Sequence, residues 1–422
     1  MSALSISSRF SPDSAIPHDA VPAVAKVERS AAWVLSSNYP GQTLLEATMT
    51  AANATASEFS ARWDVLRARA VGVGAAALVV GGGSDLAYLT GHDGHSYERM
   101  TAAVSLTSPG ASPALLVTPK LEAERITPMP EVFELGPWED SDDPIALAVG
   151  ALPEAGVVLI SDDLNANHLL AMQAARPGLT FRALNEALGG MRAVKTVAER
   201  DALRTVGSLA DKVHQQIQDG EVPLVGRTEL EVKADIHDRL LGAGHDEVVF
   251  IIVASGPNSA SPHHHPSDRV IQPGEMVLFD FGGTFNGFNS DTTRCVFTGE
   301  IPDDVAAAWT SLVAAQEAAV QAARPGNRLC DVDKAARQAL TDDGYGPEFI
   351  HRTGHGIGTE VHEHPYVTGS NETPIEVGNA FSVEPGIYRV GQWGMRLEDI
   401  VVIEEGGAVR CNSTKRVIVS VS

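Results

Sequence analysis

Apolar residues between positions 56 and 192 follow two different periods. Phe59, Trp63, Leu66 and Ala70 recur at helical spacing, which predicts an amphipathic helix. Short apolar runs predict strands at 76–80, 102–106, 114–117 and 156–160, and a further helix is expected at 164–175. Because strands alternate with helices, we expect a small α/β domain with a mostly parallel or mixed sheet.

The second part of the chain shows longer amphipathic patterns. Thr196 with Glu199, and Thr228 with Glu231, have the spacing of a capping box, so each pair predicts the start of a helix. Later segments are expected to form strands at 248–253, 275–281 and 292–297, helices at 302–323 and 330–340, and strands at 380–383 and 399–404. Two helices followed by strands, twice over, indicate a duplicated unit with pseudo-two-fold symmetry.

The length of the chain also favours more than one domain, because 422 residues exceed one ordinary hydrophobic core. We expect an N-terminal extension at 1–55, an α/β domain at 56–192 and a larger domain at 193–422. The extension is rich in Ser, Ala, Pro and Thr, and only short helices are expected in it, near 31–35 and 43–51.

Composition argues against several classes of protein. The formal net charge of −23 disfavours binding to nucleic acid or to an anionic membrane surface. Cys295, Cys330 and Cys411 are far apart and fit neither a disulfide scaffold nor a thiolate zinc site. No apolar run is long enough to cross a bilayer, and the first residues lack the pattern of a secretory signal. We therefore expect a cytoplasmic protein.

Four acidic residues and one histidine have the composition of a metal site, namely Asp280, Asp291, His355, Glu384 and Glu398. Asp280 is expected to end one strand and Asp291 to begin the next, so that a tight connection brings both carboxylates into one cavity. A single Asp or Glu is more often a surface residue, but each of these lies near an apolar run, where an unpaired charge is costly. The set suits two divalent cations, with Mn expected and Co, Zn or Fe as alternatives. Such a pair activates water, so the sequence predicts a hydrolase.

Several segments resemble the creatinase/aminopeptidase metallopeptidase family, which has the pita-bread fold. The matching segments are SGPNSASPHHHP, FDFGG, SDTTR, HRTGHGIGTEVH, SVEPGIY and MRLEDIVV, and DLAYLTG resembles the family's N-terminal domain. The resemblance implies an α+β chain, in which a duplicated ααββ catalytic domain follows a smaller α/β creatinase-like domain. It also implies that Asp291 and Glu398 bridge two metal ions. Asp280 would complete one metal site, and His355 with Glu384 the other.

The resemblance further implies which residues handle the substrate. His263, His351 and His362 fall on the family's substrate positions, and His362 would donate a hydrogen bond to the developing oxyanion. Glu384 would also relay a proton to the leaving nitrogen. Taken alone, an isolated histidine is more often structural, and the histidine run that begins at His263 could be a surface feature.

Two further residues are expected to support the metal ligands. Arg396 would orient the carboxylates, and the Thr293 hydroxyl would support Asp291.

Within the family, a two-domain chain resembles Xaa-Pro dipeptidases and Xaa-Pro aminopeptidases. We expect the dipeptidase reaction, which is hydrolysis of the bond before proline, on short peptides and in a homodimer. Many prolidases have an arginine shortly before the SVEPG-like motif, whereas residues 364–378 contain neither arginine nor lysine. The aminopeptidase therefore stays as the alternative.

Two other classes stay open from the sequence. A member of this fold can act as a hydrolase or lyase on a non-peptide small molecule. A catalytically inactive binding module is the third reading, but such members typically lose metal ligands, and all five expected residue types are present here.

Overall fold

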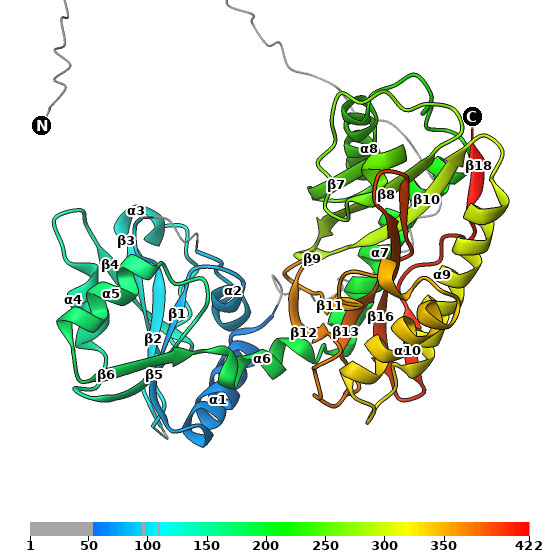
Figure 1. The fold of residues 1–422 in the computed structure, drawn as a ribbon. Helices are drawn as coiled ribbons and strands as arrows, with labels where there is room; N and C mark the ends of the chain where they lie inside the picture. The colour runs from blue at the N-terminus through cyan, green and yellow to red at the C-terminus, as the bar shows by residue number, and fades with distance from the viewer. Residues whose placement is uncertain (1–53, 95–97, 109, 422) are drawn as a thin grey trace, which may run out of the picture. The chain divides into compact units, whose positions relative to one another are not determined.

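The computed structural model of the chain describes residues 54–94, 98–108 and 110–421 (Figure 1). The short helices expected near 31–35 and 43–51 lie outside the described residues. The first part of the chain, up to residue 193, contains the helices α1 (Ala56–Gly72), α2 (Ser84–Thr90), α3 (Lys120–Ala123), α4 (Pro144–Gly150), α5 (Ala166–Ala175) and α6 (Asn185–Ala193). Its strands are β1 (Ala75–Gly81), β2 (Ala102–Leu106), β3 (Ala114–Pro119), β4 (Phe133–Trp138), β5 (Gly156–Ile160) and β6 (Leu179–Ala183).

The strands of this first part form a mixed sheet. Over the described residues its order is β4-β3-β2-β1-β5-β6. The pairs β1–β5, β5–β6 and β3–β4 are parallel, whereas β1–β2 and β2–β3 are antiparallel. The four residues that predicted the first helix, Phe59, Trp63, Leu66 and Ala70, are all buried in the core beneath α1. The predicted α/β domain with a mixed sheet is therefore confirmed.

The second part of the chain contains the helices α7 (Val197–Gln218), α8 (Glu229–Ala243), α9 (Asp303–Ala322) and α10 (Leu329–Asp342), with short 3-10 turns at Gly256–Ala260 and Gly346–Glu348. The strands of its first half are β7 (Glu247–Ser255), β8 (Met276–Phe285), β9 (Phe288–Asn289) and β10 (Thr292–Thr298). The strands of its second half are β11 (Gly354–Gly356), β12 (Glu363–Val367), β13 (Ala380–Val383), β14 (Gly386–Arg389), β15 (Trp393–Arg396), β16 (Asp399–Glu404), β17 (Gly407–Arg410) and β18 (Val419–Val421).

The predicted order of two helices followed by strands occurs twice. In the first half α7 packs against α8, and β7, β8 and β10 form an antiparallel sheet that β18 extends. In the second half α9 packs against α10, and the sheet has the order β12-β11-β13-β16-β17 among the described strands (Figure 1). Both predicted capping boxes form, at Thr196 with Glu199 and at Thr228 with Glu231.

The prediction that Asp280 ends its strand is wrong, because β8 continues to Phe285. The glycine after Phe281 allows this continuation, since a Cβ added at Gly282 would lie 1.9 Å from the Ser290 carbonyl oxygen. The chain turns later, at Asn286-Gly287, where both residues have positive φ. That pair is typical of a tight hairpin, and it joins β8 to β9.

No helix among the described residues is both long and apolar enough to span a membrane.

Candidate functional site

The two aspartates of the candidate site come from neighbouring strands. In the antiparallel pair β8–β10, Asp280 lies opposite Thr293. Asp291 immediately precedes β10, whose first residue pairs with Phe281, so both aspartates lie at the same end of the β8–β10 pair. Both aspartates are buried. The hairpin therefore brings the two carboxylates together as expected, although β8 runs past Asp280.

The two glutamates come from the ends of another strand pair. Glu384 directly follows β13, and Glu398 directly precedes β16. Because β13 and β16 are antiparallel with Val383 opposite Asp399, the two glutamates leave the sheet at the same end. The backbone carbonyl of Glu398 also accepts a 2.5 Å hydrogen bond from Arg294 Nη1, which fixes its place.

His355 lies in β11 and completes the set. Its Nδ1 is 3.1 Å from the Gly356 carbonyl oxygen, so Nδ1 carries the proton and donates it. The Nε2 atom then presents its lone pair to the carboxylates of Asp291, at 3.5 Å, and Glu384, at 3.4 Å. A lone pair that faces two carboxylate oxygens is repulsive unless a cation or a proton lies between them, so this arrangement suits a metal ligand.

The predicted ligands line one cavity of about 700 Å³, together with Arg396 and the three histidines that were predicted to handle the substrate. Within the described residues, three groups of side chains have ligand atoms within 4.8 Å of one another. These groups are Asp280 with Asp291 and Glu398, His355 with Glu384 and Glu398, and Asp291 with His355 and His362. Glu398 belongs to two of these groups, and so do Asp291 and His355, so the structure brings all five predicted ligands together.

The charges of the site fit bound cations. Burial, followed by the charges of Asp280 and Glu384, raises the pKa of Asp291 well above its ordinary value. Burial, followed by the Asp291 charge, does the same to the pKa of Glu398. One oxygen of Asp280 and one of Glu398 are buried and have no hydrogen-bond partner among the described residues. Unpartnered buried carboxylate oxygens are costly, and divalent cations would satisfy them.

Arg396 holds several of these groups in place. Its Nη2 donates to Asp280 Oδ2 at 2.6 Å, and its Nε donates to Thr293 Oγ1 at 2.9 Å. The Thr293 hydroxyl in turn donates to Glu398 Oε2 at 2.6 Å. The expectation that Thr293 supports Asp291 is therefore wrong in its partner. The register of β8 and β10 places Thr293 opposite Asp280, and the Glu398 N–H donates to the Thr293 carbonyl oxygen at 3.3 Å.

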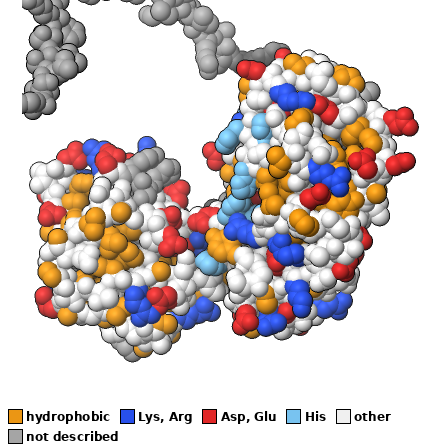
Figure 2. Space-filling model, viewed as in Figure 1, with side chains coloured by type: hydrophobic (Ala, Val, Ile, Leu, Met, Phe, Trp, Pro, Cys, Tyr) orange, Lys and Arg blue, Asp and Glu red, His pale blue; other side chains and the backbone are white. Residues whose placement is uncertain are grey.

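The three predicted substrate histidines have different surroundings. His351 is tied at both ring nitrogens, since Nδ1 donates to the Arg352 carbonyl at 2.7 Å and Nε2 lies 2.9 Å from the Tyr388 hydroxyl. His263 and His362 are exposed at the cavity. Histidine side chains gather around β9 on the face seen in Figure 2.

His362 stands directly over a predicted metal ligand. The centroid of its ring lies 3.9 Å from that of His355. Loss of hydration at the cavity is the main cause that lowers the pKa of His362 to about 4, and the nearby positive charge of Arg352 acts in the same direction. The imidazole is therefore neutral near pH 7, with one N–H available to donate a hydrogen bond.

Sequence reasoning missed the group that fixes the loop on both sides of His263, which is the Glu229 carboxylate. Glu229, the first residue of α8, is fully buried. Its carboxylate accepts hydrogen bonds from Ser255, at 2.8 Å, and from Ser267, at 2.8 and 3.0 Å. His264 Nε2 lies 2.8 Å from the same carboxylate. The sequence contains one indication of this role. A glutamate at the start of a helix, close to a loop rich in hydrogen-bond donors, can accept several hydrogen bonds.

Sequence reasoning also missed Arg352, Tyr388 and the apolar wall of the cavity. Arg352 lines the cavity, and its guanidinium lies 4.6 Å from the centroid of the Tyr366 ring. The apolar lining consists of Val249, Phe250, Ile252, Pro262 and Val361. The cavity thus joins an apolar wall to a cluster of acidic and imidazole groups.

Comparisons with known proteins agree with this architecture. A model of metallopeptidase family M24 matches residues 201–405, and a model of the creatinase/prolidase N-terminal domain matches residues 62–206. The chain is 42% identical over 364 residues to a probable dipeptidase PepE of Mycobacterium tuberculosis, an alignment that covers 85% of this chain and 95% of that protein.

Solved structures show the same similarity. Dipeptidase PepE from Mycobacterium ulcerans matches with a TM-score of 0.81 and 39% identity, covering 87% of this chain and 100% of that chain. A prolidase from Thermococcus sibiricus matches with a TM-score of 0.80 and 31% identity, covering 86% of this chain and 99% of that chain. The α+β architecture, with a creatinase-type first domain and a pita-bread second domain, is therefore confirmed.

Membership of this family implies divalent metal ions, which agrees with the acidic and histidine cluster. The chain belongs to metallopeptidase family M24 and is a peptidase similar to dipeptidases and prolidases.

Proposed function

We propose that this protein is a metal-dependent Xaa-Pro dipeptidase that holds two divalent ions on Asp280, Asp291, His355, Glu384 and Glu398. One observation carries the proposal above the others. Five buried or nearly buried ligand side chains converge from separate strands, and two of their oxygens lack a partner among the described residues. Mn is the first metal to test, followed by Co, Zn and Fe, because oxygen-rich ligation with one imidazole suits these ions.

When bound, such ions act as Lewis acids and lower the pKa of a bound water, which makes it a nucleophile near neutral pH. The residues of the chain then position and move the protons. Glu384 accepts a 3.0 Å hydrogen bond from Ser382, which leaves its second oxygen to take a proton from the attacking water. The same carboxylate can pass that proton to the proline nitrogen as it leaves. Neutral His362 donates its N–H to the carbonyl oxygen of the scissile bond.

The lining of the cavity suits proline after the scissile bond. Proline has no N–H and carries an apolar ring, so it needs apolar contact rather than a backbone hydrogen-bond acceptor. Phe250, Ile252 and Val361 supply apolar surface beside the candidate metal ligands. The names of the similar proteins, dipeptidase and prolidase, favour the same substrate class.

The choice between dipeptidase and aminopeptidase depends on the free carboxylate of a dipeptide. Residues 364–378 contain neither arginine nor lysine. Two arginines line the cavity, and Arg396 is bound to Asp280. Arg352 has no ion pair among the described residues, and its charge is therefore available for a substrate carboxylate. This cation favours the dipeptidase.

Hydrolysis of Ala-Pro compared with Ala-Pro-Ala tests the choice. Purified protein with added Mn should cleave the dipeptide with the higher kcat/KM. Faster cleavage of the tripeptide would make the protein an Xaa-Pro aminopeptidase. Failure on every proline peptide, with metal bound, would point to a non-peptide substrate of the same fold. We further propose that the protein works as a cytoplasmic homodimer, and its mass in solution by light scattering tests the dimer.

A further inference from the structure

A buried carboxylate that takes no part in the proposed chemistry lies next to His362 in the chain. Glu363 begins β12 and is 5% exposed. Arg192 Nη2 donates to Glu363 Oε2 at 2.6 Å, and Lys195 Nζ donates to Glu363 Oε1 at 2.5 Å. Arg192 Nη2 also donates to Thr359 Oγ1 at 3.2 Å. Two cations from one segment therefore hold a carboxylate and a hydroxyl of another.

The loop before His362 folds around this carboxylate. The backbone N–H of Glu360 donates to Glu363 Oε2 at 3.4 Å. At Gly358 an added Cβ would lie 2.7 Å from Glu363 Oε1, so only glycine leaves room for the carboxylate there. The Gly358 carbonyl oxygen accepts hydrogen bonds from the Asn289 backbone, at 2.9 Å, and side chain, at 3.0 Å. The loop is thus fixed at both ends.

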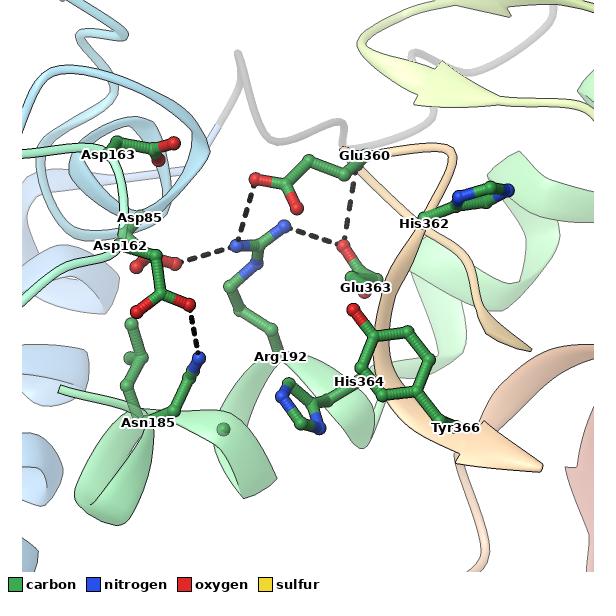
Figure 3. Close-up of a pocket in the computed structure, with 12 residues that line it drawn as sticks. Asp85, Asp162, Asp163, Asn185, Arg192, Glu360, His362, Glu363, His364 and Tyr366 are labelled. Atoms are coloured by element: carbon green, nitrogen blue, oxygen red, sulfur yellow. Dashed lines mark hydrogen bonds and ion pairs between the residues drawn. The ribbon is translucent and has the colours of Figure 1, made fainter. Parts of the chain in front are cut away.

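The Glu363 carboxylate and the His362 imidazole point in opposite directions. Figure 3 shows Glu363 turned toward Arg192, whereas the ring of the neighbouring His362 points away from that cluster. The His362 ring instead lies against His355, 3.9 Å between centroids. His362 lies in a bend and Glu363 begins β12, so the two residues are joined directly by one peptide bond. A backbone shift that follows loss of the Glu363 contacts therefore carries the His362 imidazole with it.

Arg192 extends the cluster to α2. Its Nη1 donates to Asp85 Oδ1 at 2.6 Å and lies 3.4 Å from Glu360 Oε1 (Figure 3). Asp85 is buried, at 7% exposure. Buried ion pairs are a weak source of stability because each charge loses its hydration. Five buried or half-buried charges in one cluster therefore suggest a role in fixing geometry.

We propose that Glu363 is a positioning residue that sets the orientation of His362, with Arg192 and Lys195 as its anchors. This inference rests on the proposed function, because it assigns the role of His362 in peptide hydrolysis. A displacement of about 1 Å at a reacting group is enough to lower the rate by about 100-fold. The carboxylate therefore acts on the reaction through its neighbour, without touching the substrate.

Glu363→Gln and Arg192→Lys test the proposal, each loaded with Mn. Glu363→Gln keeps the shape of the side chain but removes its charge, and Arg192→Lys keeps a charge but loses the forked contact to Asp85 and Glu363. We expect kcat for Ala-Pro to fall by about 10- to 100-fold in either variant. KM and bound Mn should stay within about three-fold of the wild-type values, since only the transition-state contact of His362 is lost.

The control is Glu404→Gln, which changes a carboxylate that is bound by Arg200 and Arg204 and does not line the cavity. Its kcat should equal that of the wild type. Two results would overturn the proposal. One is an equal decrease of kcat in Glu404→Gln and Glu363→Gln, and the other is a wild-type kcat in a folded Glu363→Gln protein. If Glu363→Gln does not fold, the result for Arg192→Lys decides in the same way.

Hydrogen exchange separates this proposal from the proposed function. If the wild type cleaves no proline peptide, the proposed function fails. The effect of Glu363 on the order of the loop at 357–363 can still be measured. Glu363→Gln should then raise amide exchange in peptides that cover 357–363, whereas Glu404→Gln should leave those peptides unchanged. Unchanged exchange in Glu363→Gln would overturn the anchoring role itself.

Discussion

At the scale of single residues, the site depends on hydrogen bonds that fix the orientation of the candidate metal ligands. Arg396 contacts Asp280 and Thr293, and Thr293 contacts Glu398. These contacts orient the carboxylate oxygens that remain free for cations. Residues that support ligands in this way commonly change metal affinity or activity by about 10- to 100-fold when they are altered.

Thr293→Val should therefore weaken metal binding. Valine has a similar shape but cannot donate to Glu398 or accept from Arg396. We expect the Kd for Mn to rise by about 10- to 100-fold, measured by calorimetry on chelator-treated protein. Thr293→Ser keeps the hydroxyl and should bind Mn as the wild type does. Equal affinities for the valine and serine variants would contradict this role.

Arg352 should decide the response to a free carboxylate. Arg352→Gln should raise KM for Ala-Pro by about 10-fold or more, because a charge-assisted hydrogen bond contributes about 1.5–3 kcal/mol. KM for Ala-Pro amide, which has no carboxylate, should not change. Arg352→Lys is the control for charge. A similar increase in KM for both substrates would show that Arg352 lines the cavity but does not bind the free carboxylate.

At the scale of helices and strands, much could be predicted from the sequence. The helix starts at Thr196 and Thr228 follow from local spacing, because a capping box needs only residues three apart. The pairing of β8 with β10 follows from the short connection between them. The sequence therefore predicts that Asp280 and Asp291 lie close together.

Other features depend on contacts between distant segments and could not be predicted. The short strands β11, β12, β14 and β15 have weak local patterns and exist because neighbouring strands pair with them. The continuation of β8 past Asp280 depends on close approach of Ser290 to Gly282. The partner of Thr293 depends on the register of that pair. Arg192 meets Glu363 across 171 positions of sequence, so no local spacing indicates the contact.

The packing of α7 on β8 should make stability depend on pH. His214 is fully buried, stacks on Phe281 at 4.0 Å between centroids, and lies 3.0 Å from the Thr292 carbonyl through Nε2. Burial, followed by the Arg294 charge, lowers its pKa well below the ordinary value. The unfolded chain therefore binds a proton below about pH 6.5 that the folded chain does not. The free energy of unfolding consequently decreases as the pH is lowered below that value.

Each pH unit below about 6.5 should remove up to about 1.4 kcal/mol of unfolding free energy through this residue. Urea unfolding at pH 5.5 and 7.5, with a chelator present, measures the loss. His214→Gln cannot titrate and can still donate to Thr292, so it should lose less stability over the same interval. An equal loss in both proteins would assign the acid sensitivity to other groups.

At the scale of the whole molecule, the candidate site should couple folding to metal binding. The carboxylates repel one another without cations, and a ligand that binds only the folded state adds stability. We expect Mn at 100 times its Kd to stabilise the wild type by about 2.7 kcal/mol for each ion bound, seen as a rise in Tm of several degrees.

For Glu398→Gln, we expect the more stable of the two proteins, variant or wild type, to depend on whether Mn is present. Without metal the variant should be at least as stable as the wild type, because one of the crowded acidic groups is replaced by a neutral amide. With Mn the wild type should be the more stable protein, since the variant has lost a ligand. Calorimetric scans with and without Mn test the reversal. A variant that Mn stabilises as strongly as the wild type would show that Glu398 holds no metal.

The most direct test of the account is the metal content of the purified chain. After incubation with Mn and removal of free ions, elemental analysis should find two ions per wild-type chain and fewer than one per chain in Asp291→Asn. Hydrolysis of Ala-Pro should require the ions in the first protein and be lost in the second. A wild-type chain that retains no transition metal, or an Asp291→Asn protein with full metal content and activity, would contradict the account.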